Sequence, residues 1–215
     1  MYYPSAKCYF SGAGGLDKGL LNAGVDVIQS LELDKTAVQT LELNFDHNVV
    51  WRDITDITVL EQNSSDIIAG GYPCTHYSTI ADIHGTRNGD DLFLHFFRHI
   101  AIEQPEMYIV ENVPGMKKFK VVMEAMTKLP NYYINIFCPV DALNWLPQKR
   151  ERLILIGTKK RFTISPPKNT KRILLSDIIE EGVKMNLPDY VLKRLNGGYR
   201  DKPIIVDPTD KLSLI

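Results

Sequence analysis

The chain has 215 residues, of which 44% are hydrophobic and 24% charged, and its formal net charge is −1. This balance is typical of a globular protein with one substantial core. The sequence has no apolar run of the roughly 18 residues that a membrane helix needs, and its start lacks the pattern of a signal peptide. Its three cysteines form no C-x-x-C pair, which argues against a disulfide framework and a zinc ribbon. A cytoplasmic protein is expected.

The net charge conceals an uneven distribution along the chain. Residues 1–110 hold 6 Lys and Arg against 15 Asp and Glu, whereas residues 111–215 hold 19 against 11. A local excess of positive charge favours a polyanionic partner for the second half. A solvated basic face without a partner is the alternative.

The first 32 residues predict a strand (6–10), a glycine-rich turn (11–15), a helix (16–24) and a second strand (25–32). Strand, glycine turn and helix form the first unit of a nucleotide-binding α/β fold. The second strand ends in Glu32, where a carboxylate can accept hydrogen bonds from the ribose hydroxyls of an adenosine cofactor.

A helix is expected from about 35 to 45 and a third strand over 49–52, with Asp53 and Ile54 at its end, placed to contact an adenine. A further short strand, 65–69, is broken by Gly70, Gly71 and Pro73, so that Cys74 is presented on a constrained loop. Ligands bind at the carboxyl ends of parallel strands, which places Cys74 for chemistry. An inert, buried thiol is the alternative.

Residues 83–89 are polar and are expected to be mobile, and a helix is predicted over 90–102. His95 and His99 share one face of that helix, but a third ligand is not evident, so no metal site is expected. The apolar strand 107–110 leads into Glu111, which we expect to act as an acid. Capping of a helix that starts near Met116 is the alternative role.

The last predicted strands cover 132–138 and 153–157. Between them Arg150 and Arg152, two residues apart at a strand entry, should point the same way and face a base or a phosphate. Solvation of this charged run at the surface is the alternative. Beyond Arg161 we expect a linker at 165–167 and a short helix over 173–181.

In order and spacing, these motifs resemble those of the DNA (cytosine-5)-methyltransferases. The matching segments are 10–15, Glu32, 53–54, 70–74, 111–113 and 148–152. The resemblance implies an α/β, Rossmann-like, S-adenosylmethionine-dependent methyltransferase fold with a mostly parallel, doubly wound sheet. Residues 1–160 would form the catalytic domain, and 161–215 would lead toward a target-recognition domain.

The resemblance also implies a role for individual residues. Cys74 would attack C6 of a cytosine flipped out of double-stranded DNA, Glu111 would act at its N3, Arg152 would hold its O2 side and Arg150 would brace the site. The residues that would bind S-adenosylmethionine are Phe10, Gly12, Gly14, Gly15, Leu16, Glu32, Leu33, Asp53, Ile54, Gly71, Pro73 and Leu92. Further substrate contacts would come from Ser78, Asn112, Val113 and Gln148.

The sequence departs from the family pattern in three places. Thr75 and Tyr77 stand where the family usually has Gln and Phe, and the segment before Gln148 is one residue shorter. The recognition domain and the last motifs are not within the 215 residues, so either a second polypeptide supplies them or the chain is truncated. A restriction-modification enzyme of prokaryotic or phage origin is expected. A tRNA cytosine-5 methyltransferase, an inactive regulatory DNA-binding paralogue and an ordinary dehydrogenase are the alternatives.

Overall fold

The computed structural model describes residues 2–59, 64–73, 92–165 and 173. Cys74, Thr75, Tyr77 and Ser78, the polar segment 83–89 and all but the first residue of the predicted helix 173–181 lie outside this part. By compactness the chain divides into two units, residues 1–140 with 151–166, and residues 141–150 with 167–215.

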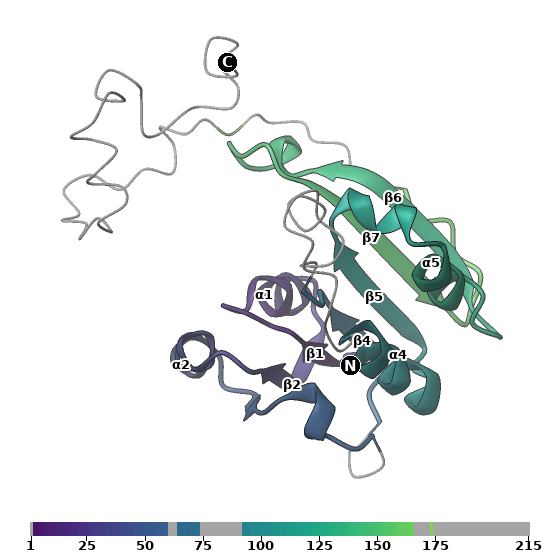
Figure 1. Cartoon of the computed structure of the whole chain (residues 1–215). Coiled ribbons are helices and arrows are strands. Elements are labelled where there is room, and N and C mark those ends of the chain that lie inside the picture. The colour runs from purple at the N-terminus through teal and green to yellow at the C-terminus, as the bar shows by residue number, and fades with distance from the viewer. Residues whose placement is uncertain (1, 60–63, 74–91, 166–172, 174–215) are drawn as a thin grey trace, which may run out of the picture. The chain divides into compact units, whose positions relative to one another are not determined.

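The first unit is built on a sheet of seven strands in the order β3-β2-β1-β4-β5-β7-β6 (Figure 1). The neighbouring strands from β3 to β5 are all parallel, and β7 is antiparallel to β5. The elements are β1 (Ser5–Tyr9), α1 (Gly15–Asn22), β2 (Asp26–Glu32), α2 (Lys35–Asn44), β3 (Asn48–Trp51), the 3-10 helix η1 (Ile54–Asp56), β4 (Ile67–Gly70), α4 (Leu92–Glu103), β5 (Met107–Asn112), the 3-10 helix η2 (Pro114–Lys118), α5 (Lys120–Thr127), β6 (Tyr133–Asp141), the 3-10 helix η3 (Ala142–Asn144) and β7 (Glu151–Thr158).

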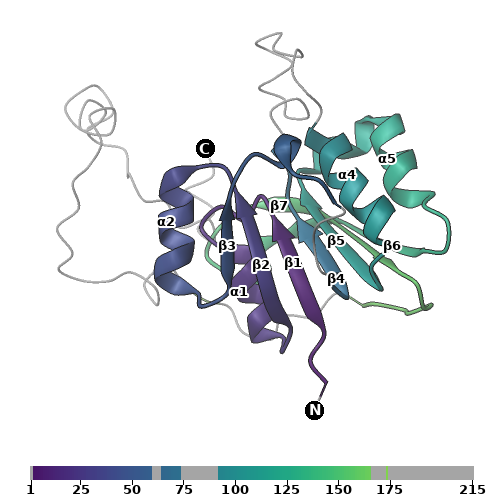
Figure 2. The ribbon, with the colours of Figure 1, turned by 90° about the horizontal axis from the view of Figure 1, so that it is seen from below.

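Helices cover both faces of this sheet, as Figure 2 shows for α1 on one side and for α4 and α5 on the other. Along β1 the side chains alternate between the faces, as the pleat of a strand requires. Ala6 and Cys8 pack with Leu20 of α1 in one cluster, whereas Tyr9 packs with Phe96 of α4 in the larger one. The predicted α/β, doubly wound, mostly parallel fold is therefore confirmed.

Several element boundaries differ from those predicted, two of them in ways that the packing explains. Strand β4 continues through Gly70, which pairs with both neighbouring strands, β1 and β5. Position 70 has to be glycine because a Cβ atom there would lie 2.8 Å from the Phe96 ring of α4. The helix predicted to start near Met116 is two elements, η2 and then α5 from Lys120. Phe119 separates them with a non-helical backbone (φ −92°, ψ 87°), while its side chain packs against the core.

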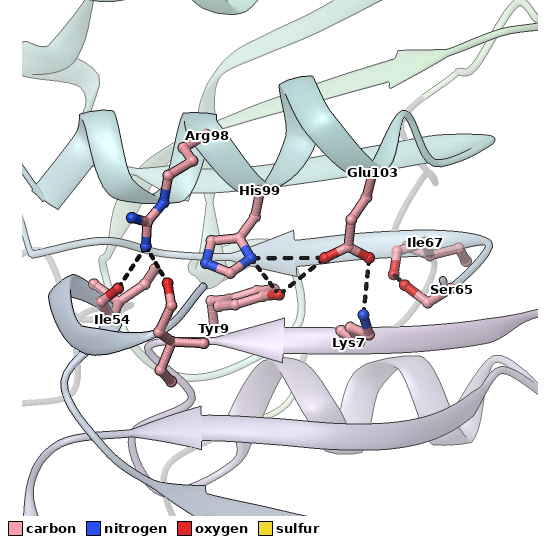
Figure 3. A network of polar contacts seen from close by, with 9 residues as sticks. Lys7, Tyr9, Ile54, Ser65, Ile67, Arg98, His99 and Glu103 are labelled. Atoms are coloured by element: carbon pink, nitrogen blue, oxygen red, sulfur yellow. Dashed lines mark hydrogen bonds and ion pairs between the residues drawn. The ribbon is translucent and has the colours of Figure 1, made fainter. Parts of the chain in front are cut away.

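A buried polar network joins α4 to β1 (Figure 3). Lys7 Nζ lies 2.8 Å from Glu103 Oε2, and both side chains are nearly inaccessible, at 1% and 5% exposed. The Tyr9 hydroxyl lies 3.0 Å from His99 Nδ1, and His99 is itself 3.6 Å from Glu103. The helix is thus held on the sheet by ionic and polar contacts in addition to its apolar face.

The part of the chain with described coordinates contains no group of three or more His, Cys, Asp or Glu side chains arranged to hold a metal ion. Of the two histidines expected to share one helix face, His95 and His99, the second contacts Tyr9 and Glu103 through Nδ1. Among the described helices, none combines the length and the apolar character needed to cross a membrane.

Candidate functional site

A cavity of about 490 Å³ opens where β1, β2, β3 and β4 end and α4 begins. Each of these strands ends at the same edge of the sheet because all four are parallel. The side chains that line the cavity are those of Phe10, Leu31, Glu32, Leu33, Asp34, Lys35, Arg52, Asp53, Ile54, Gly71, Pro73 and Leu92.

Eight of the twelve residues predicted to bind the cofactor line this cavity. Four lining residues were missed by sequence reasoning, namely Leu31, Asp34, Lys35 and Arg52. All four lie within two residues of the predicted Glu32, Leu33 or Asp53, so proximity to a strand end is the signal that the sequence offers for them. Of the described residues that were predicted, Gly12, Gly14, Gly15 and Leu16 do not line the cavity.

The glycine turn between β1 and α1 has an unusual backbone. Phe10, Gly12 and Gly14 all have positive φ, at 56°, 55° and 85°. Gly14 also meets a steric limit, since a Cβ atom there would lie 2.3 Å from the Phe45 ring. Only glycine satisfies both demands at position 14. Leu16 lies in α1 and packs against the smaller core cluster, so its described contacts are structural.

Glu32 is held at the mouth of the cavity by three backbone donors. The amide of Gly12 donates to its Oε2 at 2.7 Å, and those of Leu33 and Asp34 donate to its Oε1 at 2.9 Å each. These contacts tie the end of β2 to the glycine turn. They orient the carboxylate and stabilise its negative charge.

The loop after β3 is fixed from two sides. Asp53 Oδ1 accepts a hydrogen bond from the Thr55 amide at 2.9 Å and so starts η1. On the other side Arg98 of α4 donates from Nη2 to the carbonyl oxygens of Ile54 and Ile57, at 2.8 and 2.5 Å (Figure 3). This clamp fixes Asp53 and Ile54 in the cavity wall.

A carboxylate and a guanidinium group meet beside the cavity. Arg152 Nε lies 2.6 Å from Glu111 Oε1, and their side chains are 22% and 35% exposed. Glu111 also lies against Gly71 of the cavity wall, because a Cβ atom at Gly71 would be 2.8 Å from Glu111 Oε2. The predicted catalytic pair is therefore assembled next to the cavity.

Asn112 connects the end of β5 to the loop after β4. Its buried side chain donates to the Tyr72 carbonyl oxygen at 3.2 Å and accepts from the Val113 amide at 2.8 Å. These contacts hold the segment that leads into Cys74. Val113 is the N-cap residue of η2, and its amide donates to Asn112, whereas the Glu111 carboxylate contacts Arg152.

The predicted fork of Arg150 and Arg152 does not form on one strand. Strand β7 begins at Glu151, so only Arg152 lies in it, whereas Arg150 belongs to the second unit. In that unit Asp141 Oδ1 accepts hydrogen bonds from the amides of Leu143 and Arg150, both at 3.0 Å. Gln148 and Arg150 expose their side chains there.

Cys8 is poorly suited to act as a nucleophile. It is buried, and this burial, followed by the charge of Asp17 and a hydrogen bond to it, raises the pKa of the Cys8 thiol far above its ordinary value. A nucleophilic cysteine needs an accessible thiolate instead. Cys8 is thus a packing residue of the smaller core cluster.

Comparisons with known proteins identify the family of this chain. A family model described as C-5 cytosine-specific DNA methylase matches residues 9–201, which is most of the chain. The chain belongs to this methylase family. Family membership accounts for the order of the strand-end motifs around the cavity.

Curated and structural relatives agree with this family assignment. The Type II methyltransferase M.FnuDI of Fusobacterium nucleatum is 33% identical over 162 residues, which cover 73% of this chain and 47% of M.FnuDI. M.AquIA of Picosynechococcus is 31% identical over 188 residues, covering 75% of this chain and 74% of M.AquIA. The crystal structure of a prophage-encoded DNA modification methyltransferase (E. coli) is 28% identical with a TM-score of 0.67, covering 81% of this chain and 53% of that one.

This methylase-family chain spans about half the length of M.FnuDI and of most other curated relatives that it matches. The residues matched by the family model, 9–201, include the residues that line the cavity and the Glu111–Arg152 pair.

Proposed function

We propose that the chain is the catalytic part of a DNA (cytosine-5)-methyltransferase, which transfers a methyl group from S-adenosylmethionine to C5 of a flipped-out cytosine. The observation that carries this proposal is the contact across Gly71. One side of Gly71 faces the cavity, and the other faces Glu111, which is paired with Arg152. A cofactor site and an acid–base pair therefore share one wall.

The cavity fits the proposed cofactor in size and chemistry. Its volume of about 490 Å³ lies within the range of about 300–1,000 Å³ for ligand pockets. Apolar side chains, among them Phe10, Leu33, Ile54 and Leu92, suit an adenine, and the Glu32 carboxylate suits the ribose hydroxyls. When bound, S-adenosylmethionine supplies an activated methyl group. Gly71 and Pro73 would bound the cavity on the side that leads to Cys74.

The residues of the chain would activate the cytosine. The Cys74 thiolate would form a bond to C6, which shifts electron density to C5, while Glu111 donates a hydrogen bond or proton at N3. After C5 has accepted the methyl group, loss of the C5 proton and expulsion of the thiolate restore the aromatic base. Arg152 would hold both Glu111 and the O2 side of the base.

The substrate assignment is part of the proposal. The positive second half of the chain, with 19 Lys and Arg against 11 Asp and Glu, suits a polyanion. DNA is the polyanion on which members of this family are named to act, and we propose its double-stranded form as the substrate. A target-recognition region, on a second polypeptide or in a longer form of this chain, would complete the enzyme, whose location we expect to be cytoplasmic.

Two measurements test the proposal. Titration calorimetry of the chain with S-adenosylhomocysteine should show binding, and a folded chain that does not bind it would contradict the cofactor assignment. Duplex DNA in which 5-fluorocytosine replaces cytosine should trap a covalent complex in the presence of S-adenosylmethionine and the recognition polypeptide, because fluorine cannot leave C5 as a proton does.

The trapping experiment has a matched control and a substrate comparison. Cys74→Ser should abolish the trapped complex, whereas Cys8→Ser should not. Transfer of tritiated methyl groups to tRNA, but not to duplex DNA, would replace the DNA assignment with a tRNA one. Robust transfer to DNA by the 215-residue chain alone would refute the need for a second polypeptide.

A further inference from the structure

Asp17 is a buried carboxylate that the proposed chemistry does not use. It lies in the first turn of α1, directly beyond the glycine turn, and its side chain is 0% exposed. Burying a charged carboxylate costs several kcal/mol unless hydrogen-bond donors compensate for the lost water. The donors that converge on Asp17 therefore indicate what this carboxylate holds in place.

Besides the Cys8 thiol of β1, which also contacts this carboxylate, side chains from three other segments meet at Asp17 Oδ1. The Ser11 hydroxyl of the glycine turn donates to it at 3.1 Å, and the Ser30 hydroxyl of β2 also donates to it. His47, from the connection between α2 and β3, places Nε2 3.8 Å from the same oxygen and 2.6 Å from Ser30 Oγ. One buried oxygen thus links the turn, the second strand and the following connection.

Ser11 connects Asp17 to the end of β2 beside the cofactor cavity. Its amide donates to the Leu31 carbonyl oxygen at 3.3 Å, and its own carbonyl oxygen accepts from the Gly14 amide at 2.9 Å. With the side chain bound to Asp17, Ser11 is held at three points. The next amide along the chain, that of Gly12, donates to Glu32 Oε2 at 2.7 Å.

We propose that Asp17 is a positioning residue of the cofactor site, which acts through Ser11 to hold the glycine turn so that the Gly12 amide meets Glu32. Asp17 does not line the cavity and would not touch the cofactor. The proposal rests on the proposed function only in that Glu32 is taken to bind the cofactor ribose.

A purely structural role for Asp17 would be to tie α1 to β2. The two serines separate these roles, because both donate to the same carboxylate oxygen but only Ser11 belongs to the turn. Each hydroxyl donates one hydrogen bond to Asp17, but the Ser30 hydroxyl also contacts His47 Nε2. Ser30→Ala should therefore lose at least as much thermal stability as Ser11→Ala, which makes it a stringent control.

The experiment measures each variant with and without ligand. In Ser11→Ala we expect the dissociation constant of S-adenosylhomocysteine to rise about tenfold, as loss of a hydrogen bond to a charged group permits. Hydrogen exchange of the Gly12 amide in the ligand-free chain, followed by NMR, should become about tenfold faster. In Ser30→Ala both quantities should stay within about twofold of the wild-type values, although its unfolding temperature should fall at least as far as that of Ser11→Ala.

Equal changes in the two variants, or an unchanged Gly12 exchange rate in Ser11→Ala, would overturn the positioning role. The exchange measurement needs no ligand, so it decides this proposal separately from the cofactor assignment. If the wild-type chain fails to bind S-adenosylhomocysteine but Gly12 exchange still depends on Ser11, the proposed function fails and the positioning of the turn by Asp17 stands.

Discussion

Arg152 Nε and Glu111 Oε1 lie 2.6 Å apart, although the two residues come from strands that run in opposite directions. The antiparallel register pairs Asn112 with Leu153. The residue before Leu153 therefore lies at the end of β5, where Glu111 can reach it. Reversal of β7 within a mostly parallel sheet is what brings a guanidinium group to the carboxyl edge.

Glu111→Gln should lower the rate of methyl transfer by about 10²–10⁴-fold, the usual contribution of a positioned acid or base. Arg152→Lys should also lower it, because a lysine cannot keep the planar, directional contact of the guanidinium. Both side chains are partly exposed, so either change should alter the free energy of unfolding by about 1 kcal/mol or less. Rate measurements alongside urea unfolding check this. A large loss of stability without a loss of rate would refute the catalytic assignment.

Gly71→Ala should slow methyl transfer while S-adenosylhomocysteine binding changes less. The added Cβ atom would lie 2.8 Å from Glu111 Oε2, so the carboxylate has to move. Gly19→Ala is the control, since a Cβ atom at this position of α1 meets nothing within 4 Å. That change should leave the rate intact and raise stability by up to about 1 kcal/mol. Equal rates for the two variants would show that Glu111 needs no fixed position.

Glu32→Gln should weaken S-adenosylhomocysteine binding by about 10- to 100-fold. Three backbone amides donate to the carboxylate, and in the variant at least one of them would face an NH₂ group. Loss of one charged hydrogen bond costs about 1.5–3 kcal/mol. Glu42→Gln on the exposed side of α2 is the matched control. Calorimetric titration measures both, and unchanged affinity in Glu32→Gln would contradict the placement of the ribose.

Glu103→Gln should destabilise the protein by about 3–5 kcal/mol, because the buried Lys7 ammonium loses its carboxylate partner. The double variant Lys7→Met/Glu103→Leu removes both charges and should recover most of this loss. Urea unfolding of the two variants gives the comparison. If the double variant is as unstable as Glu103→Gln, the loss of stability does not come from the unpaired charge of Lys7.

His47 should make stability depend on pH below neutrality. Burial lowers the pKa of His47, although the charges of Asp17, Asp26 and Asp46 oppose this. In the unfolded chain it titrates near its ordinary value of about 6.5. Between the two pKa values the unfolded state binds more protons, so the free energy of unfolding decreases as pH falls from about 7. Thermal unfolding of His47→Gln between pH 5 and 7 should show a flatter dependence than the wild type.

Local patterns in the sequence were enough to predict most of the residues that line the cavity. Apolar runs located β1 to β5 to within a few residues, and the glycine turn, Glu32 and Asp53 were recognised at their ends. This succeeded because parallel strands bring their carboxyl ends to one edge whatever their exact register. Lys35 and Arg52 are not predicted from the sequence. Hydrophobic periodicity does not show whether a charged residue beside a motif lines a cavity or faces solvent.

The sequence by itself determined the fold class, the family motifs and the residues at the strand ends, because these depend on hydrophobic periodicity and on backbone demands such as the positive φ of Gly14. Only the tertiary structure decided that Arg152 lies on the strand beside Glu111, and that Ser11, Ser30 and His47 converge on Asp17. Those contacts join segments that are distant along the chain. They depend on strand direction, register and packing, which no local pattern encodes.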